Sequence, residues 1–276
     1  MRIPGRKFKT PSVQTLGVLL FGLLNVQLAN ADCMPAGTGE KVVVTKVYDG
    51  DTLKLEDGRH VRVLGINAPE IDHGNDKAGQ ALAEDSRRAA ERFIKSAKSI
   101  RLFYDRETTD RYGRTLAHVY DADENSLAAG LLRSGLAFHV AIPPNLSLND
   151  CLSAQESVAR KKGLGIWSHA NWQAKPAASL TQDDTGFQRI KGRVANLSIK
   201  RAVWLELDGP LVIQISEDDL KQFPSVDWNA YEGQIVEVRG WVVNRKSDKP
   251  NKNSDGKSFK SLVIQPRIAG NLEMVP

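Results

Sequence analysis

Two Asp-Gly dipeptides separate short alternating segments near the start of the chain, and this pattern constrains the fold more than any other feature. Asp49-Gly50 and Asp57-Gly58 are tight-turn signals. The segments Val42–Val47, Leu53–Leu55 and Val61–Leu64 that they separate alternate apolar and polar residues, as strands with one buried face do. The stretch therefore predicts an antiparallel meander that buries one side, which is the beginning of a β-barrel.

Helices and further strands are expected to follow this meander. Apolar residues at helical spacing predict a helix from about Ala78 to Lys98, and shorter patterns predict helices over Leu127–Ser134 and Asn149–Lys162. Strands are predicted over Ile100–Tyr104 and Leu116–Tyr120. The first domain, residues 32–168, is therefore expected to be a mainly β, α+β domain with three helices.

A second domain is predicted over residues 187–276, after a Pro-, Ala- and Asp-containing linker at 169–186. Three strand patterns, a helix-start signal at Ser216 and Asp219, and two further strand patterns are the order of a small OB-like β-barrel. Its last two strands are joined by a lysine-rich loop that is most simply a solvated connection. The predicted strands are Phe187–Leu197, Ala202–Leu207, Leu211–Ile215, Val236–Val243 and Leu262–Ile264.

The first 31 residues have the composition of a cleavable signal peptide. A basic start precedes an apolar run at Leu16–Leu28 that is too short to span a bilayer, and Ala29-Asn30-Ala31 has the small residues of a cleavage site. The alternative is a retained anchor. Cleavage after Ala31 predicts a periplasmic or secreted protein with no stable membrane association.

Removing the signal peptide also changes the charge balance of the chain. Four of its 38 basic residues leave, so the mature chain has 34 basic against 33 acidic residues. Affinity for nucleic acid must therefore come from local charge arrangement rather than from net charge.

The two cysteines of the chain, Cys33 and Cys151, are both in the predicted mature protein. Disulfides form by default in exported proteins, so we expect a single bridge between them. A metal-binding or catalytic role for these two cysteines is not expected, because they lie far apart in the sequence and show no CxxC spacing.

The ends of the predicted strands bear groups that suit phosphate chemistry. Asp51 enters one strand, Arg62 lies on the next, and Asn67 and Glu70 follow it. Oxygen ligands suit a hard divalent cation, a carboxylate activates water, and an arginine matches the charge that develops on phosphoryl oxygens. If the strands pair as the turns indicate, these groups converge at one end of the barrel and favour phosphodiester hydrolysis.

Five ordered motifs resemble the staphylococcal nuclease-like family, the thermonucleases. They are VYDGDTLKL, VRVLGINAPE, DRYGR, LLRSGLA and GLGIW, and they cover about residues 41–167. The resemblance implies an OB-fold-type barrel for the first domain. It also implies a Ca²⁺ site in which Asp51, Asn67 and the backbone carbonyl of Ala68 are ligands. Asn67 stands where a second metal-binding aspartate would be expected, and it supplies an oxygen without a charge.

The same resemblance implies the catalytic residues. Glu70 would be the general base that activates water, Arg62 and Arg114 would neutralise the phosphate in the transition state, and Tyr112 would lie beside the nucleotide. The implied reaction is hydrolysis of DNA and RNA to products that end in a 3′-phosphate.

Two alternatives to an exported nuclease remain open at this point. One is a non-hydrolytic nucleic-acid-binding protein whose site is degenerate because Asn67 weakens metal binding. The other is an envelope protein whose barrels bind protein or peptide. The presence of Arg62, Glu70 and Arg114 together favours catalysis, because simple binding needs no carboxylate directed at a phosphate.

Overall fold

The computed structural model describes residues 33–72, 79–245 and 260–275, and residues 32–276 form one compact unit. The predicted signal peptide and most of the lysine-rich loop lie outside the described residues, and both stay predictions.

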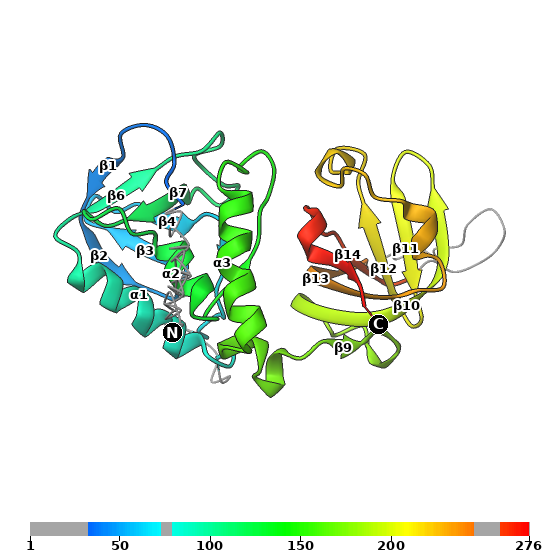
Figure 1. The fold of residues 1–276 in the computed structure, drawn as a ribbon. Coiled ribbons are helices and arrows are strands. Elements are labelled where there is room, and N and C mark those ends of the chain that lie inside the picture. The colour runs from blue at the N-terminus through cyan, green and yellow to red at the C-terminus, as the bar shows by residue number, and fades with distance from the viewer. Residues whose placement is uncertain (1–32, 73–78, 246–259, 276) are drawn as a thin grey trace, which may run out of the picture. The chain divides into compact units, whose positions relative to one another are not determined.

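The first barrel is a six-stranded sheet in the order β1-β6-β7-β4-β3-β2 (Figure 1). β1 and β2 follow each other with one residue, Val43, between them. They pair with β6 and β3 respectively, so together they act as one bent strand that closes a five-stranded barrel. β4 and β7 are parallel and the other pairs are antiparallel, which is an OB-type arrangement. The strands are β1 (Glu40–Val42), β2 (Val44–Val47), β3 (Thr52–Leu55), β4 (His60–Val63), β6 (Ile100–Phe103) and β7 (Thr115–Tyr120).

Three α-helices accompany this barrel, as the sequence predicts. They are α1 (Ala83–Ser96), α2 (Leu127–Arg133) and α3 (Asn149–Lys162), and α2 packs against α3 (Figure 1). The Ser126 side chain caps α2 by accepting a hydrogen bond from the backbone of Ala129, and α3 ends at Gly163 in a left-handed conformation. No helix in the described parts of the chain has the length and apolar character needed to cross a membrane.

A disulfide joins Cys33 to Cys151 across 118 positions of sequence. It ties the beginning of the described chain to α3, and Cys33 lies in the buried core of the first barrel. The bridge removes conformational freedom mainly from the unfolded chain, so its stabilisation grows with the length of the loop it closes.

We expect a Cys33→Ser/Cys151→Ser variant to lose about 4 kcal/mol of unfolding free energy, because the closed loop is long. Urea denaturation followed by circular dichroism measures the loss. Wild-type protein treated with a reductant should unfold at the same urea concentration as the variant. Equal midpoints for the variant and the untreated protein would contradict the expectation.

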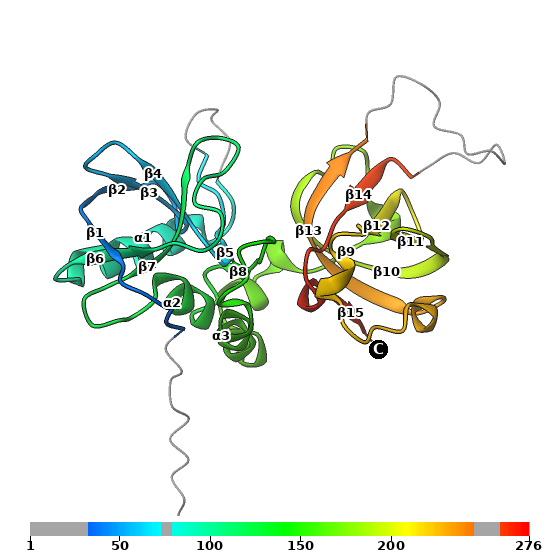
Figure 2. The same ribbon diagram turned by 90° about the horizontal axis from the view of Figure 1, so that it is seen from above.

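The second barrel has the same strand connectivity as the first. β10 pairs with β11, β11 with β12, β12 in parallel with β14, β14 with β13, and β13 closes the barrel on β10 (Figure 2). The predicted OB-like barrel is therefore present. Its strands are β10 (Gly186–Ile199), β11 (Val203–Leu207), β12 (Leu211–Ile215), β13 (Ile235–Asn244) and β14 (Leu262–Ile264), with β9 (Lys175–Pro176) and β15 (Leu272–Met274) at its edges.

The helix-start signal at Ser216 is followed by 3₁₀ turns and not by an α-helix. Two 3₁₀ turns, Leu220–Gln222 and Trp228–Tyr231, occupy the connection between β12 and β13. The Ser216 hydroxyl donates to the Asp219 carboxylate at 2.5 Å, so these polar groups stabilise a local turn.

The segment predicted as a linker, residues 169–186, is largely exposed but is anchored at several positions. Trp172 is buried against Phe138 and Phe187, and its indole N–H donates to the Ala81 carbonyl at 2.9 Å. Residues of this segment also form β9, which pairs with β10. The connection is therefore anchored to both barrels, while the domain boundaries themselves stay a prediction.

Candidate active site

Asp51 is the centre of a buried polar cluster at the end of β3. Its side chain lies in the turn between β2 and β3 and is 1% exposed. One carboxylate oxygen accepts a hydrogen bond from the backbone N–H of Ala68 at 2.6 Å, and the other accepts from the Thr52 hydroxyl at 3.1 Å. The turn thereby holds Asp51 beside the segment that follows β5 (Ile66–Asn67).

Arg62 connects this aspartate to Asn67. Its guanidinium forms an ion pair with the Asp51 carboxylate and donates to the Asn67 side-chain oxygen at 3.1 Å. Arg62 lies opposite Thr52 in the pairing of β3 with β4, so the register of the meander brings the two charges together. The structure therefore brings Asp51, Arg62 and Asn67 together at this end of the barrel.

Gly50 lets this turn pack closely against the rest of the domain. A Cβ atom at this position would lie 2.0 Å from the Ser86 hydroxyl on α1 and 2.8 Å from the Ala68 Cβ. Helix α1 and the segment after β5 therefore enclose the turn, which explains why both of its aspartates are buried.

Glu70 lies at the exposed rim of the cluster. Its backbone is fixed by Gln80, which accepts a hydrogen bond from the Glu70 N–H at 2.8 Å and donates its own N–H to the Glu70 carbonyl at 2.9 Å. Glu70 is also close enough to Asp49 to raise the pKa of that carboxyl. The carboxylate is thus exposed to solvent beside a buried anionic group.

Arg114 and Tyr112 come from the loop that leads into β7. The Arg114 guanidinium donates to Asp110 at 2.7 Å and lies 5.6 Å from the centre of the Tyr112 ring. Arg114 directly precedes β7, which lies parallel to β4, the strand of Arg62. Tyr112 is 68% exposed, so its ring is open to a binding partner.

Comparisons with known proteins decide the family. A family model described as "Staphylococcal nuclease homologue" matches residues 60–169. A thermonuclease of Staphylococcus intermedius is 36% identical over 135 residues, which are 47% of this chain and 77% of the relative. The chain belongs to the staphylococcal nuclease family. It is therefore a nuclease, as its motifs and barrel predict.

Other relatives of the nuclease agree with this assignment. A thermonuclease of Staphylococcus hyicus is 32% identical over 129 residues, covering 46% of this chain and 75% of the relative. Endonuclease YncB of Bacillus subtilis (strain 168) is 32% identical over 136 residues, covering 48% and 63% respectively. The family model ends at residue 169, so it does not include the second barrel.

Asp49 is more deeply buried than the sequence indicates. It forms the turn as expected, because its carboxylate accepts the Asp51 N–H at 2.9 Å, but it is only 6% exposed. Burial is the main cause that raises its pKa to about 7, and the negative charges of Asp51 and Glu70 add to this effect. The site therefore has an excess of closely spaced negative charge.

We expect an Asp49→Asn variant to change how stability depends on pH. In wild type the raised pKa favours folding below pH 4, and this contribution is lost as the pH rises to about 7. The variant keeps a hydrogen-bond acceptor that does not titrate. The unfolding free energy of the variant minus that of wild type should therefore increase by about 1.4 kcal/mol per pH unit as the pH rises through that window. Urea unfolding in a chelator at pH 4 to 8 measures this difference, and a constant difference would contradict it.

The oxygen atoms of the cluster fit a hard cation. Asp49, Asp51 and Asn67 are all buried, and the positive guanidinium of Arg62 already bridges two of them. The described residues contain no group of three or more His, Cys, Asp and Glu placed to hold a metal. The candidate set differs from such a group because it combines carboxylates with an amide and a backbone carbonyl, all of which are ligands that Ca²⁺ accepts.

Two supporting residues were not singled out from the sequence. Asp110 accepts hydrogen bonds from the backbone and the side chain of Arg114 and from the Tyr112 backbone. Burial would raise its pKa, but these hydrogen bonds outweigh burial and lower it. The position of Asp110, four residues before Arg114 in a turn, is a signal that the sequence offers. The anchoring of Glu70 by Gln80 has no such local signal, because it joins residues ten positions apart.

Proposed function

We propose that the protein is an exported, Ca²⁺-dependent nuclease that hydrolyses phosphodiester bonds of DNA and RNA and leaves 3′-phosphate ends. The observation that supports this proposal best is the Asp51–Arg62–Asn67 cluster with Glu70 at its rim. It combines anionic oxygens, a fixed cation and a solvent-exposed base within one end of a barrel.

Glu70 acts as the general base. Its carboxylate takes a proton from the attacking water, and its exposure at the rim leaves room for water and substrate. The two hydrogen bonds between Glu70 and Gln80 hold the backbone at this position. The leaving group is the 5′-oxygen of the next nucleotide, so the phosphate stays on the 3′ side.

Arg62 and Arg114 stabilise the phosphoryl oxygens as negative charge develops on them. A guanidinium has five N–H donors, so Arg62 retains donors for a phosphate after it contacts Asp51 and Asn67. Asp110 orients Arg114 within the loop that leads into β7. Tyr112 contacts the nucleotide with its exposed ring.

Asp51, Asn67 and the Ala68 carbonyl would hold the metal ion, with Asp49 close by. A bound Ca²⁺ supplies positive charge that polarises the scissile phosphate. It would also compensate the negative charges of Asp51 and Glu70, which add to the effect of burial in raising the pKa of Asp49. An uncharged Asn67 makes the expected affinity weaker than that of a site with another carboxylate.

Export by the predicted signal peptide places this activity in the periplasm or outside the cell. The Cys33–Cys151 disulfide supports an oxidising compartment, because such bonds persist outside the cytosol.

The chemistry of the product ends tests the proposed reaction. Single-stranded DNA and RNA oligonucleotides with a 5′ label should yield shorter products that a 3′-phosphatase shifts on a sequencing gel. Products with a free 3′-hydroxyl would contradict the proposed direction of cleavage. Binding of the oligonucleotides without any product would favour the non-hydrolytic alternative.

A further inference from the structure

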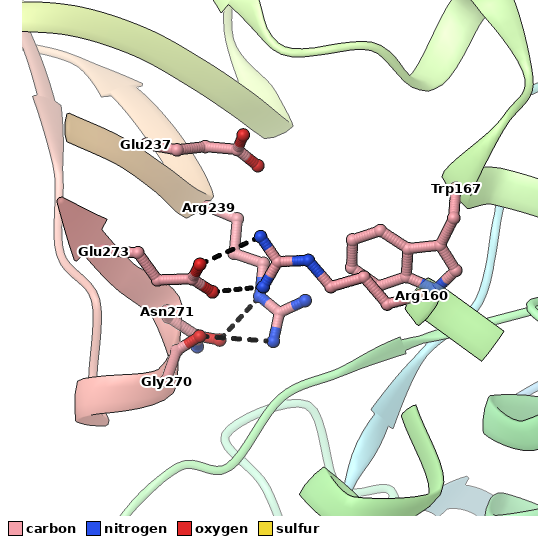
Figure 3. Close-up of a pocket in the computed structure, with 7 residues that line it drawn as sticks. All are labelled: Arg160, Trp167, Glu237, Arg239, Gly270, Asn271 and Glu273. Atoms are coloured by element: carbon pink, nitrogen blue, oxygen red, sulfur yellow. Dashed lines mark hydrogen bonds and ion pairs between the residues drawn. The ribbon is translucent and has the colours of Figure 1, made fainter. Parts of the chain in front are cut away.

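A buried arginine of the second barrel contacts a helix of the nuclease barrel. Arg239 lies on β13 and is 6% exposed, and its guanidinium donates to the Glu156 carboxylate on α3 at 2.5 Å. It also donates to the Asn271 side chain at 2.8 Å and to the Gly270 carbonyl at 3.4 Å. Figure 3 shows Arg239 directed toward Gly270 and Asn271 beside Trp167. The residue is therefore held on several sides.

Glu156 extends this contact into the nuclease barrel. Its side chain is 4% exposed, and the carboxylate oxygen that does not face Arg239 accepts the backbone N–H of His139 at 2.6 Å. A buried carboxylate needs a compensating charge, and Arg239 supplies one. Loss of Arg239 would leave this carboxylate uncompensated, which weakens its hold on His139.

His139 belongs to the short strand β8 (Phe138–His139), which supports the proposed metal ligand. His139 pairs with Ile66, and Phe138 pairs with Asn67. A two-stranded ladder of this length is not stable by itself, so its position depends on contacts outside it. The Glu156 hydrogen bond to His139 is such a contact.

We propose that Arg239 is a positioning residue for the nuclease site. It fixes Glu156, and Glu156 fixes β8. β8 pairs with Ile66 and Asn67, so it holds Asn67 where Arg62 contacts it, directly before Ala68, whose N–H Asp51 accepts. The inference rests on the proposed function of Asn67 and Ala68. The second barrel would thereby stabilise the position of β5, the strand that contains Asn67, in addition to any contact with substrate.

A second ion pair between the same elements offers a matched control. Arg160 on α3 pairs with Glu273 on β15, and its guanidinium also lies over Trp167 (Figure 3). An Arg160→Gln variant removes the pair with Glu273 but retains the hydrogen bonds from Arg239 to Glu156 and from His139 to Glu156. Its only effect on Glu156 is the loss of a weaker, longer-range charge interaction.

Amide hydrogen exchange without Ca²⁺ tests the structural part of the proposal. In Arg239→Gln, exchange in residues 65–68 and 138–140 should be about tenfold faster than in wild type, because β8 loses its support. Arg160→Gln should exchange like wild type in these segments. Equal exchange in both variants would overturn the proposal, even if wild type proved to have no nuclease activity.

Calcium titration of DNA cleavage tests the functional part. Arg239→Gln should need about tenfold more Ca²⁺ for half-maximal rate, while KM for DNA at saturating Ca²⁺ stays unchanged. If Arg239→Gln does not fold, Arg239→Lys keeps the charge and should show the same shift to a smaller extent. A Ca²⁺ requirement equal to that of Arg160→Gln would overturn the proposal. Absence of cleavage in wild type would instead refute the proposed function, and the exchange result would still stand.

Discussion

A Glu70→Gln variant should lose about 10²- to 10⁴-fold in kcat, which is the usual contribution of a general base. The substitution keeps the size of the side chain and the backbone hydrogen bonds to Gln80, but it removes the group that accepts a proton from water. Affinity for DNA should change little. Single-turnover cleavage at saturating Ca²⁺ separates the chemical step from binding.

Asp72→Asn is the matched control for this variant. Asp72 lies two residues from Glu70 and is also exposed, so its substitution removes the same charge from the same segment. We expect Asp72→Asn to retain most of the wild-type kcat. If both variants lost activity equally, the effect of Glu70 would be one of local charge, and the assignment as general base would be wrong.

An Arg62→Lys variant should lower kcat by about 10²-fold, because a lysine ammonium lacks the planar, bidentate donor geometry with which a guanidinium matches a phosphate. The positive charge beside the buried Asp51 is retained, so the free energy of unfolding should fall much less than in a charge-removing variant. Cleavage kinetics and urea unfolding of the same preparation measure the two effects.

Arg59→Lys provides the corresponding control on the barrel surface. Arg59 also pairs with two carboxylates, Glu40 and Asp57, but it is far more exposed than Arg62. Its substitution should leave kcat close to the wild-type value. A similar loss of activity in both arginine variants would indicate a general effect on the sheet instead of a role at the phosphate.

Most of the regular structure could be predicted because its signals are local. Alternation and Asp-Gly turns predicted β3 and β4 within one residue at either end, and the helical pattern over Leu127–Ser134 predicted α2 within one residue. Barrel closure could not be predicted in the same way. It depends on the interruption at Val43, which directs β1 to β6 and β2 to β3 over long sequence distances.

The candidate site was predictable to the extent that strand register determines it. Asp51 directly precedes Thr52, which pairs with Arg62, so their contact follows from the register of β3 and β4. Burial of Asp49 does not follow from local sequence, because it depends on α1 enclosing Gly50. The contact between Arg239 and Glu156 was also beyond prediction, since it joins residues 83 positions apart in two barrels.

The Ca²⁺ dependence of cleavage is the most direct test of the proposed metal-dependent nuclease site. Purified wild type and an Asn67→Asp variant are compared by the rate of DNA hydrolysis as Ca²⁺ is added to chelator-treated protein. We expect no hydrolysis in chelator and saturation with Ca²⁺ in wild type. Asn67→Asp should reach half-maximal rate at a lower Ca²⁺ concentration, because the added carboxylate strengthens the site. Hydrolysis that persists in chelator, or an identical Ca²⁺ requirement in the two proteins, would contradict the proposal.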